Sequence, residues 1–280
     1  MTGRTAAVAI PSSAPWSRSK LLALLVGGVL AAVLALVGLV LAVVQNSSSS
    51  TGPAASAKLD ASVAPPSQVE PVPAVDPNAD RDELAAHPMP TVPLSASYPL
   101  PISVKDPGPP IMLPRSTRTG PAGVPTGFPR TPEGAMAQLA AIDSTALNAA
   151  SLPAARDVIA AWAMPGGPTT TSWSGIAAIA QLLDSAQVSG GSGQLAVITT
   201  PLMGLIKGTV GDGFVIPCVD FQIDVTLNTT ARGAIADCQR MVWTGDRWMI
   251  GPGSEPADPP SVWPGSDLAL EVGYKDLRRG

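Results

Sequence analysis

Three carboxylates in the C-terminal half of the chain, Asp220, Asp224 and Asp237, have the chemistry that acid–base catalysis uses. Catalysis also requires an orienting partner in a pocket, and the single histidine is far from these residues in the sequence. Asp220 and Asp224 alternate with apolar residues, so we expect them on the solvated face of a strand together with Gln222. The sequence therefore predicts that the protein is not an enzyme.

The histidine, His87, precedes Pro88 in a proline-rich stretch, with no acidic or nucleophilic partner arranged around it, and we expect it to be solvated. Patterns typical of a nucleophile elbow, a phosphate-binding loop, a zinc protease or a calcium loop do not occur in the sequence. A Ser-x-x-Lys match at residues 17–20 is interpreted as charge beside a membrane helix. We therefore expect no catalytic residue, no cofactor and no metal ligand.

Cys218 and Cys238 are the two cysteines of the chain, and they stand in no metal-binding spacing. They fall on two strands that we expect to be neighbours in one hairpin. Outside the reducing cytosol this arrangement favours a disulfide, which would stabilise the domain by roughly 3 kcal/mol. The pairing depends on register, because a turn of four or five residues would move the cysteines out of direct opposition.

Trp243 and Trp248 flank a Gly-Asp pair in the stretch MVWTGDRWMI. If Gly245 and Asp246 form a two-residue turn, the two tryptophans lie opposite each other on adjacent strands. Directly opposed aromatic residues add roughly 0.2 to 1 kcal/mol beyond their burial. We therefore interpret them as a structural aromatic pair, while an exposed carbohydrate-binding platform is the alternative.

Residues 21–44, LLALLVGGVLAAVLALVGLVLAVV, contain no charged or polar side chain. A helix of this length can cross the roughly 30 Å hydrocarbon layer of a membrane. Arg18 and Lys20 precede the stretch and the first charge after it is Lys58, which predicts a cytoplasmic N-terminus. A cleaved signal peptide is the competing interpretation, but its apolar region would be shorter. We expect a single-pass protein of the cell membrane.

The remaining composition divides the chain into four parts. We expect a cytoplasmic head at 1–20, the membrane helix at 21–44, a disordered proline-rich linker at 45–127, and an extracytoplasmic domain at 128–280. The formal net charge is −4 and charged residues make up 14% of the chain, so no basic field for direct nucleic-acid binding is expected.

Within residues 128–280 the sequence predicts three helices followed by strands. Thr131 can cap a helix that starts at Pro132, a second helix starts after Ser151, and a third spans residues 172–187. One or two short strands broken at Pro201 should follow, then strands at 218–228, 233–243 and 247–250, and a short helix from Ser266 or Asp267 to Leu270. This order predicts an α+β fold with three helices packed on a curved antiparallel sheet.

The membrane helix, the linker and three further stretches together resemble a known family. The three stretches are GFPRTPEGAMAQLAAID, CVDFQIDVTL and DCQRMVWTGDRWMIGPG. The chain resembles the membrane-anchored assembly proteins of type IV secretion and conjugation machines, of an actinobacterial type, whose outer domain is a nuclear-transport-factor-like (cystatin-like) cone. The resemblance implies a non-enzymatic scaffold that contacts channel or coupling subunits and forms homo-oligomers. It supplies no catalytic residues to carry over.

Two other functions remain open. An extracytoplasmic small-ligand-binding module on the same cone would need an open pocket lined by apolar groups and a few polar ones. An accessory protein of another cell-envelope transport system would share the whole topology.

Overall fold

The computed structural model describes residues 78–188 and 195–280. The predicted head and membrane helix lie outside these residues. No helix in the described part of the chain combines the length and the apolar character needed to cross a membrane.

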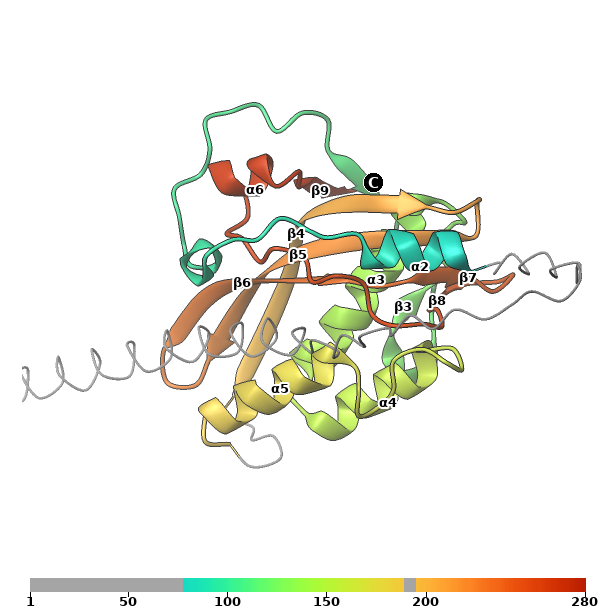
Figure 1. Ribbon diagram of the computed structural model, residues 1–280. Helices are drawn as coiled ribbons and strands as arrows, with labels where there is room; N and C mark the ends of the chain where they lie inside the picture. The colour runs from blue at the N-terminus through green and yellow to red at the C-terminus, as the bar shows by residue number, and fades with distance from the viewer. Residues whose placement is uncertain (1–77, 189–194) are drawn as a thin grey trace, which may run out of the picture.

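Three helices form one layer of the domain, in the predicted order and ahead of the long strands (Figure 1). They are α3 (Pro132–Asn148), α4 (Leu152–Trp162) and α5 (Ser174–Ser185). The Thr131 hydroxyl accepts a hydrogen bond from the Gly134 amide at 3.1 Å, so this residue caps α3 as expected. Helix α3 lies between the sheet and the other two helices, because it contacts β4 and β5 as well as α4 and α5.

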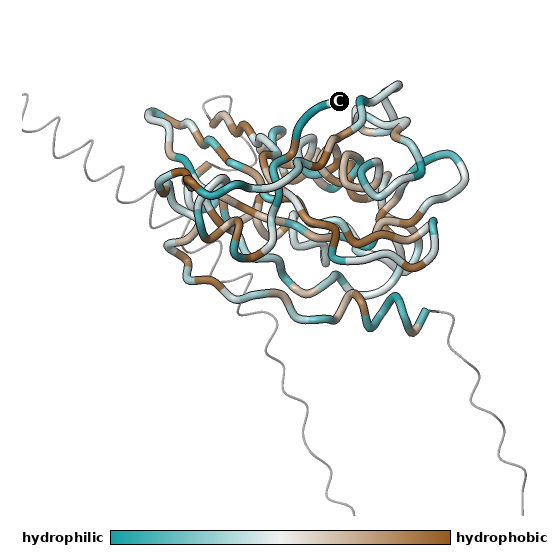
Figure 2. Tube along the Cα trace, turned by 90° about the horizontal axis from the view of Figure 1, so that it is seen from above, coloured by the Kyte–Doolittle hydropathy of each residue, from teal (hydrophilic) through white to brown (hydrophobic). Residues whose placement is uncertain are grey.

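The sheet is curled and mostly antiparallel, with the order β1-β9-β4-β5-β7-β8 and with β6 also paired to β5. Its long members are β4 (Ala196–Thr209), β5 (Phe214–Thr226) and β6 (Thr230–Cys238), followed by the short β7 (Met241–Trp243) and β8 (Trp248–Ile250). The α+β class and the curled antiparallel sheet are therefore confirmed. Seen from above, apolar stretches gather inside the body, whereas the helix at residues 79–86 is largely hydrophilic (Figure 2).

Residues 78–127, which the sequence analysis assigns to a disordered linker, contribute elements to this body. They form α2 (Ala79–Ala86), β1 (Ile111–Leu113), β2 (Arg118–Thr119) and β3 (Pro125–Thr126), with 3-10 turns at Leu94–Ser97 and Pro121–Gly123. The prediction of disorder for residues 78–127 is wrong, because a proline-rich extended segment can pack on a sheet through its side chains with few backbone hydrogen bonds. The folded part begins before residue 128.

The C-terminal segment adds α6 (Asp267–Glu271) and β9 (Lys275–Arg279). The Ser266 hydroxyl accepts a hydrogen bond from the Ala269 amide and begins α6, as the sequence predicts. Strand β9 was not predicted. It pairs in parallel with β1 and antiparallel with β4, so it joins residues 111–113 to the long strands in one sheet.

Two prolines explain where the predicted strands were wrong. Strand β4 continues through Pro201, because a register shift between Pro201 and Met203 accommodates the missing amide donor. Strand β5 begins before Pro217, at Phe214. Next to Pro217 the predicted strand 233–243 divides into β6 and β7, which both pair with β5.

The sheet is covered on both faces along the first half of β5, where residues 214–221 are all buried. Odd-numbered side chains such as Val219 and Phe221 belong to the core beneath the helices. Even-numbered ones such as Ile216 and Cys218 belong to a second core with residues of the segments 85–97 and 260–274. Farther along β5 the second face is less covered, so alternation returns only from Gln222 onward.

Candidate functional site

A cavity of about 550 Å³ lies at the β6 edge of the sheet. Its walls come from α3, the start of α5, the facing parts of β5 and β6, and the two chain segments 88–92 and 257–261. Most wall residues are apolar, among them Leu147, Trp173 and Phe221. The second segment is tied to the chain just before the first, because the Ala257 amide donates a 3.0 Å hydrogen bond to the Ala85 carbonyl.

Asp143 brings a carboxylate into this apolar wall from α3. It occupies the same helix face as Leu139 and Leu147, four residues away on either side, and only 1% of it is exposed. Neither carboxylate oxygen accepts a hydrogen bond from any residue that the structure describes. Asp143 was not among the predicted site residues, although a carboxylate within the apolar stripe of a helix is a signal that could have found it.

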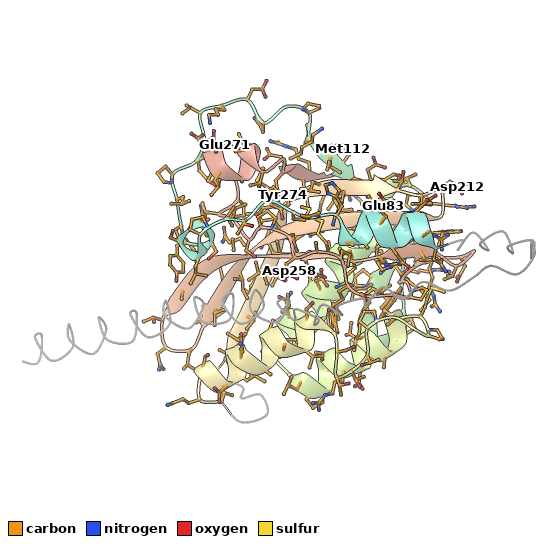
Figure 3. All side chains as sticks on the ribbon, viewed as in Figure 1. Glu83, Met112, Asp212, Asp258, Glu271 and Tyr274 are labelled. Carbon is orange, nitrogen blue, oxygen red and sulfur yellow. A yellow bond between two sulfur atoms is a disulfide. The ribbon has the colours of Figure 1, made fainter. Side chains whose placement is uncertain are left out.

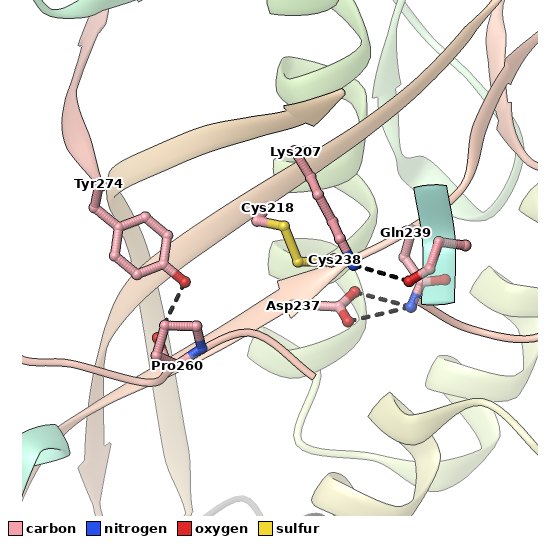
Figure 4. Close-up of a disulfide and its surroundings, with 8 residues drawn as sticks. Lys207, Cys218, Asp237, Cys238, Gln239, Pro260 and Tyr274 are labelled. Atoms are coloured by element: carbon pink, nitrogen blue, oxygen red, sulfur yellow. Dashed lines mark hydrogen bonds between the residues drawn. A yellow bond between two sulfur atoms is a disulfide. The ribbon is translucent and has the colours of Figure 1, made fainter. Parts of the chain in front are cut away.

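Asp237 contributes the second carboxylate, from β6. In the ladder it lies opposite Val219, and Ile235 lies opposite Phe221, so these side chains share the face that looks toward the helices. Both Asp237 oxygens accept hydrogen bonds of 3.1 Å from the Gln239 side-chain amide (Figure 4). Asp237 remains half-buried, so its carboxylate is reachable from the cavity.

Glu255 links this carboxylate to the start of α5. Its Oε1 accepts a 2.9 Å hydrogen bond from the Gln239 amide that also serves Asp237. The same carboxylate accepts hydrogen bonds from the backbone amide and the hydroxyl of Ser174. A negative charge at a helix N-terminus is stabilised by the helix dipole, so Glu255 is held in place as a fixed anion near Asp237.

Burial and neighbouring acidic residues raise the pKa values of Asp143 and Asp237. Burial raises the pKa of Asp143 well above its ordinary value, and the charges of Asp237 and Glu255 add to the shift. Burial, followed by the charge of Glu255, raises the pKa of Asp237 to about 7, although the hydrogen bond from Gln239 opposes the shift. Asp258, on the segment that passes across the front of the strands in Figure 3, makes a smaller contribution to the same rise in the pKa of Asp237.

Trp173 places an unpartnered donor in the same wall. The indole is 2% exposed, and its Nε1 donates to no residue within the described ranges. The cavity therefore combines two features that are costly to bury without partners, a carboxylate acceptor and an indole donor.

The structure separates the carboxylates that the sequence analysis grouped. Asp224 and Gln222 are half-buried, and Asp224 lies 3.3 Å from the guanidinium of Arg232. The prediction that Asp220 is solvated is wrong, because it is fully buried beneath the segments 85–97 and 260–274. Burial raises the pKa of Asp220 well above its ordinary value.

Asp220 also lies on the face opposite Asp237, so it does not join the cavity. Burial raises the pKa of Tyr274 well above its ordinary value, and the charge of Asp220 adds to the shift. The Tyr274 hydroxyl donates to the Pro260 carbonyl at 3.0 Å. His87 is exposed at the end of α2, beside Pro88 of the cavity wall.

The two structural pairs have the expected partners. Cys218 and Cys238 form a disulfide and are directly opposed in the ladder, with their Cα atoms 4.1 Å apart (Figure 4). Trp243 lies opposite Trp248, with the ring centroids 5.4 Å apart in an edge-to-face arrangement. Trp248 is fully buried and donates a 2.8 Å hydrogen bond to the Pro129 carbonyl, so its indole nitrogen is occupied within the core.

The cavity chemistry is that of a binding site for a positively charged or hydrogen-bond-donating group. Two carboxylates with raised pKa values share an apolar enclosure, and no lysine or arginine is among the described residues that line it. Within the described ranges no group of three His, Cys, Asp or Glu residues could hold a metal ion. In comparisons with known proteins, no family model, curated sequence or solved structure matches the chain.

Proposed function

We propose that the chain is a non-enzymatic, single-pass membrane component of a conjugative DNA-transfer apparatus related to type IV secretion. Its extracytoplasmic domain would act by binding other subunits of that apparatus. The observation that carries the proposal is a Cys218–Cys238 disulfide in a chain that also contains the apolar stretch 21–44. Disulfides persist outside the reducing cytosol, and an apolar stretch of this length supports a membrane anchor.

The order of elements gives further support. Three helices followed by a curled antiparallel sheet are the elements that the resemblance to conjugation assembly proteins leads one to expect. Because α2, β1 and β9 enlarge the folded part, only residues 45–77 remain between the apolar stretch and the first described residue. The proposed domain is therefore joined to its anchor by a shorter connection than the sequence analysis assumed.

Labelling with a membrane-impermeant maleimide tests the topology. In intact cells, Ser254→Cys should be labelled, because Ser254 is exposed on the described domain. Ser13→Cys, in the predicted cytoplasmic head, is the matched control and should be labelled only after lysis. Labelling of both or neither in intact cells would refute the proposed orientation.

Co-purification tests the assembly role. The full chain, cross-linked in membranes of cells that carry the conjugative element and then solubilised, should recover a coupling ATPase or a channel subunit. Recovery of the chain only as an isolated monomer would count against the proposal.

A specific observation favours a second function, the small-ligand-binding module. Such a module needs a pocket of mainly apolar character with a few polar groups. The cavity that contains Asp143, Asp237 and Trp173 has this character and a volume of about 550 Å³.

A further inference from the structure

We propose that the cavity binds a small organic cation, an ammonium or guanidinium group carried on an apolar body. The inference specifies the ligand of the second function and rests on the cavity being a binding site. It does not depend on the assembly role.

The first step is the unpartnered carboxylate of Asp143. Its two oxygens are buried, and no described residue donates a hydrogen bond to either of them. A buried acceptor left without a donor is costly, and the cost is greater for an ionised carboxylate. An ammonium or guanidinium group would supply the missing donors and the opposite charge at once, in a charge-assisted hydrogen bond.

The charged groups around Asp143 are negative. Asp237 lines the same cavity, and Glu255 acts on both carboxylates as a nearby negative charge. Among the described residues of the cavity wall none is a lysine or arginine. An anionic ligand would meet only like charges, whereas a cation would relieve the repulsion between the carboxylates.

The apolar part of the cavity wall can contact the apolar body of the ligand. Leu147, Trp173 and Phe221 offer surface for an apolar body next to the charged group. An inorganic cation such as calcium would need six to eight oxygen ligands in general, and a mainly apolar wall is poorly suited to that requirement. The Nε1 of Trp173, which also has no partner among the described residues, could donate to an acceptor on the same ligand.

The experiment compares three probes of nearly equal size, phenethylamine, 2-phenylethanol and 3-phenylpropionate. Each is titrated calorimetrically into the full chain reconstituted in lipid nanodiscs at pH 8, where Asp237 is mostly ionised. Three variants are titrated in the same nanodiscs, so that partition of the probes into lipid cancels. Asp143→Asn and Asp237→Asn each replace one carboxyl group of the cavity by an amide, and Asp157→Asn makes the same replacement on the exposed face of α4 as the matched control.

The amine should bind the wild-type chain at least about tenfold more tightly than the alcohol, as expected for a hydrogen bond to a charged group. Asp143→Asn should reduce that preference to within about threefold, while Asp157→Asn should leave it unchanged. Binding of N-acetyl-lysinamide with the same dependence on Asp143 would support a lysine side chain of a polypeptide as the source of the cation.

Equal affinity for the amine and the alcohol, or a preference that survives Asp143→Asn, would overturn the cation proposal and leave ligand binding standing. If none of the probes binds and none changes the melting temperature, the result would count against both the cation proposal and the small-ligand-binding function. Tighter binding of calcium ions than of the amine would also overturn the proposal.

Discussion

Raising the pH from 5 to 8 should destabilise the folded domain through the ionisation of Asp237. Burial and the charge of Glu255 raise the pKa of this residue from its ordinary value of 3.8 to about 7. A group with a raised pKa in the folded state contributes stability that is complete below the unfolded pKa and is lost as the pH rises through the folded one. For this shift the relation gives a loss of about 2 to 3 kcal/mol in the free energy of unfolding between pH 5 and 8.

Urea unfolding of the full chain in nanodiscs, followed by tryptophan fluorescence at several pH values, measures this loss. Asp237→Asn should remove most of the pH dependence and should unfold at a higher urea concentration than the wild type at pH 8. His87→Gln controls for the one histidine of the chain, which is exposed. A free energy of unfolding that is constant from pH 5 to 8, or equally steep in Asp237→Asn, would refute the reasoning.

Three further outcomes are expected from the packing. Replacing Cys218 and Cys238 by alanine should lower the free energy of unfolding by about 3 kcal/mol, as measured by urea titration against the oxidised wild type, because a loop of 20 residues is no longer closed. Trp248→Ala should lower the free energy of unfolding by about 3 to 5 kcal/mol, and Trp243→Ala by less, because Trp248 is fully buried and Trp243 is half-buried. Equal losses in melting temperature for the two variants would contradict this. Asp82→Asn should speed proteolysis between residues 78 and 97, because it removes the ion-pair partner of the 4% exposed Arg240; an unchanged cleavage rate would count against this anchoring of α2.

Local signals in the sequence were sufficient where the determining contact is local. The Thr131 hydroxyl and Pro132 begin α3, and Ser266 begins α6, because a cap needs only residues three positions apart. The Gly245–Asp246 turn sets the register of the two tryptophans in the same way. These features were predicted correctly, as was the placing of α3, α4 and α5 ahead of the long strands.

The sequence was insufficient where distant segments decide the outcome. Asp220 and Asp224 occupy equivalent positions in an alternating strand, yet Asp220 is fully buried and Asp224 is not. The difference arises because the segments 85–97 and 260–274 cover only the first half of β5. Neither segment has the periodicity of a core element, so the second core could not be read from the pattern.

The cavity was missed for a related reason. Asp143 and Asp237 are almost a hundred residues apart, on a helix and on the edge strand of a sheet, and the walls around them come from two proline-rich segments. The position of Asp143 in an apolar helix stripe was visible, but its significance depends on Asp237 facing the same space. That relation is tertiary and no spacing in the sequence expresses it.

The disulfide and the cavity are connected through the register of β6. Side chains alternate between the two faces of a strand, so Asp237 faces the helices because its neighbour Cys238 is fixed on the other face by its bond to Cys218. A slip of one residue would turn the carboxylate away from Asp143 and direct a cysteine into the cavity. The ladder between β5 and β6 ends at the Cys218–Cys238 pair, next to Pro217, so the disulfide closes the ladder at the end nearest Asp237. The bond that supports an extracytoplasmic location thus also holds one of the two carboxylates in the proposed binding site.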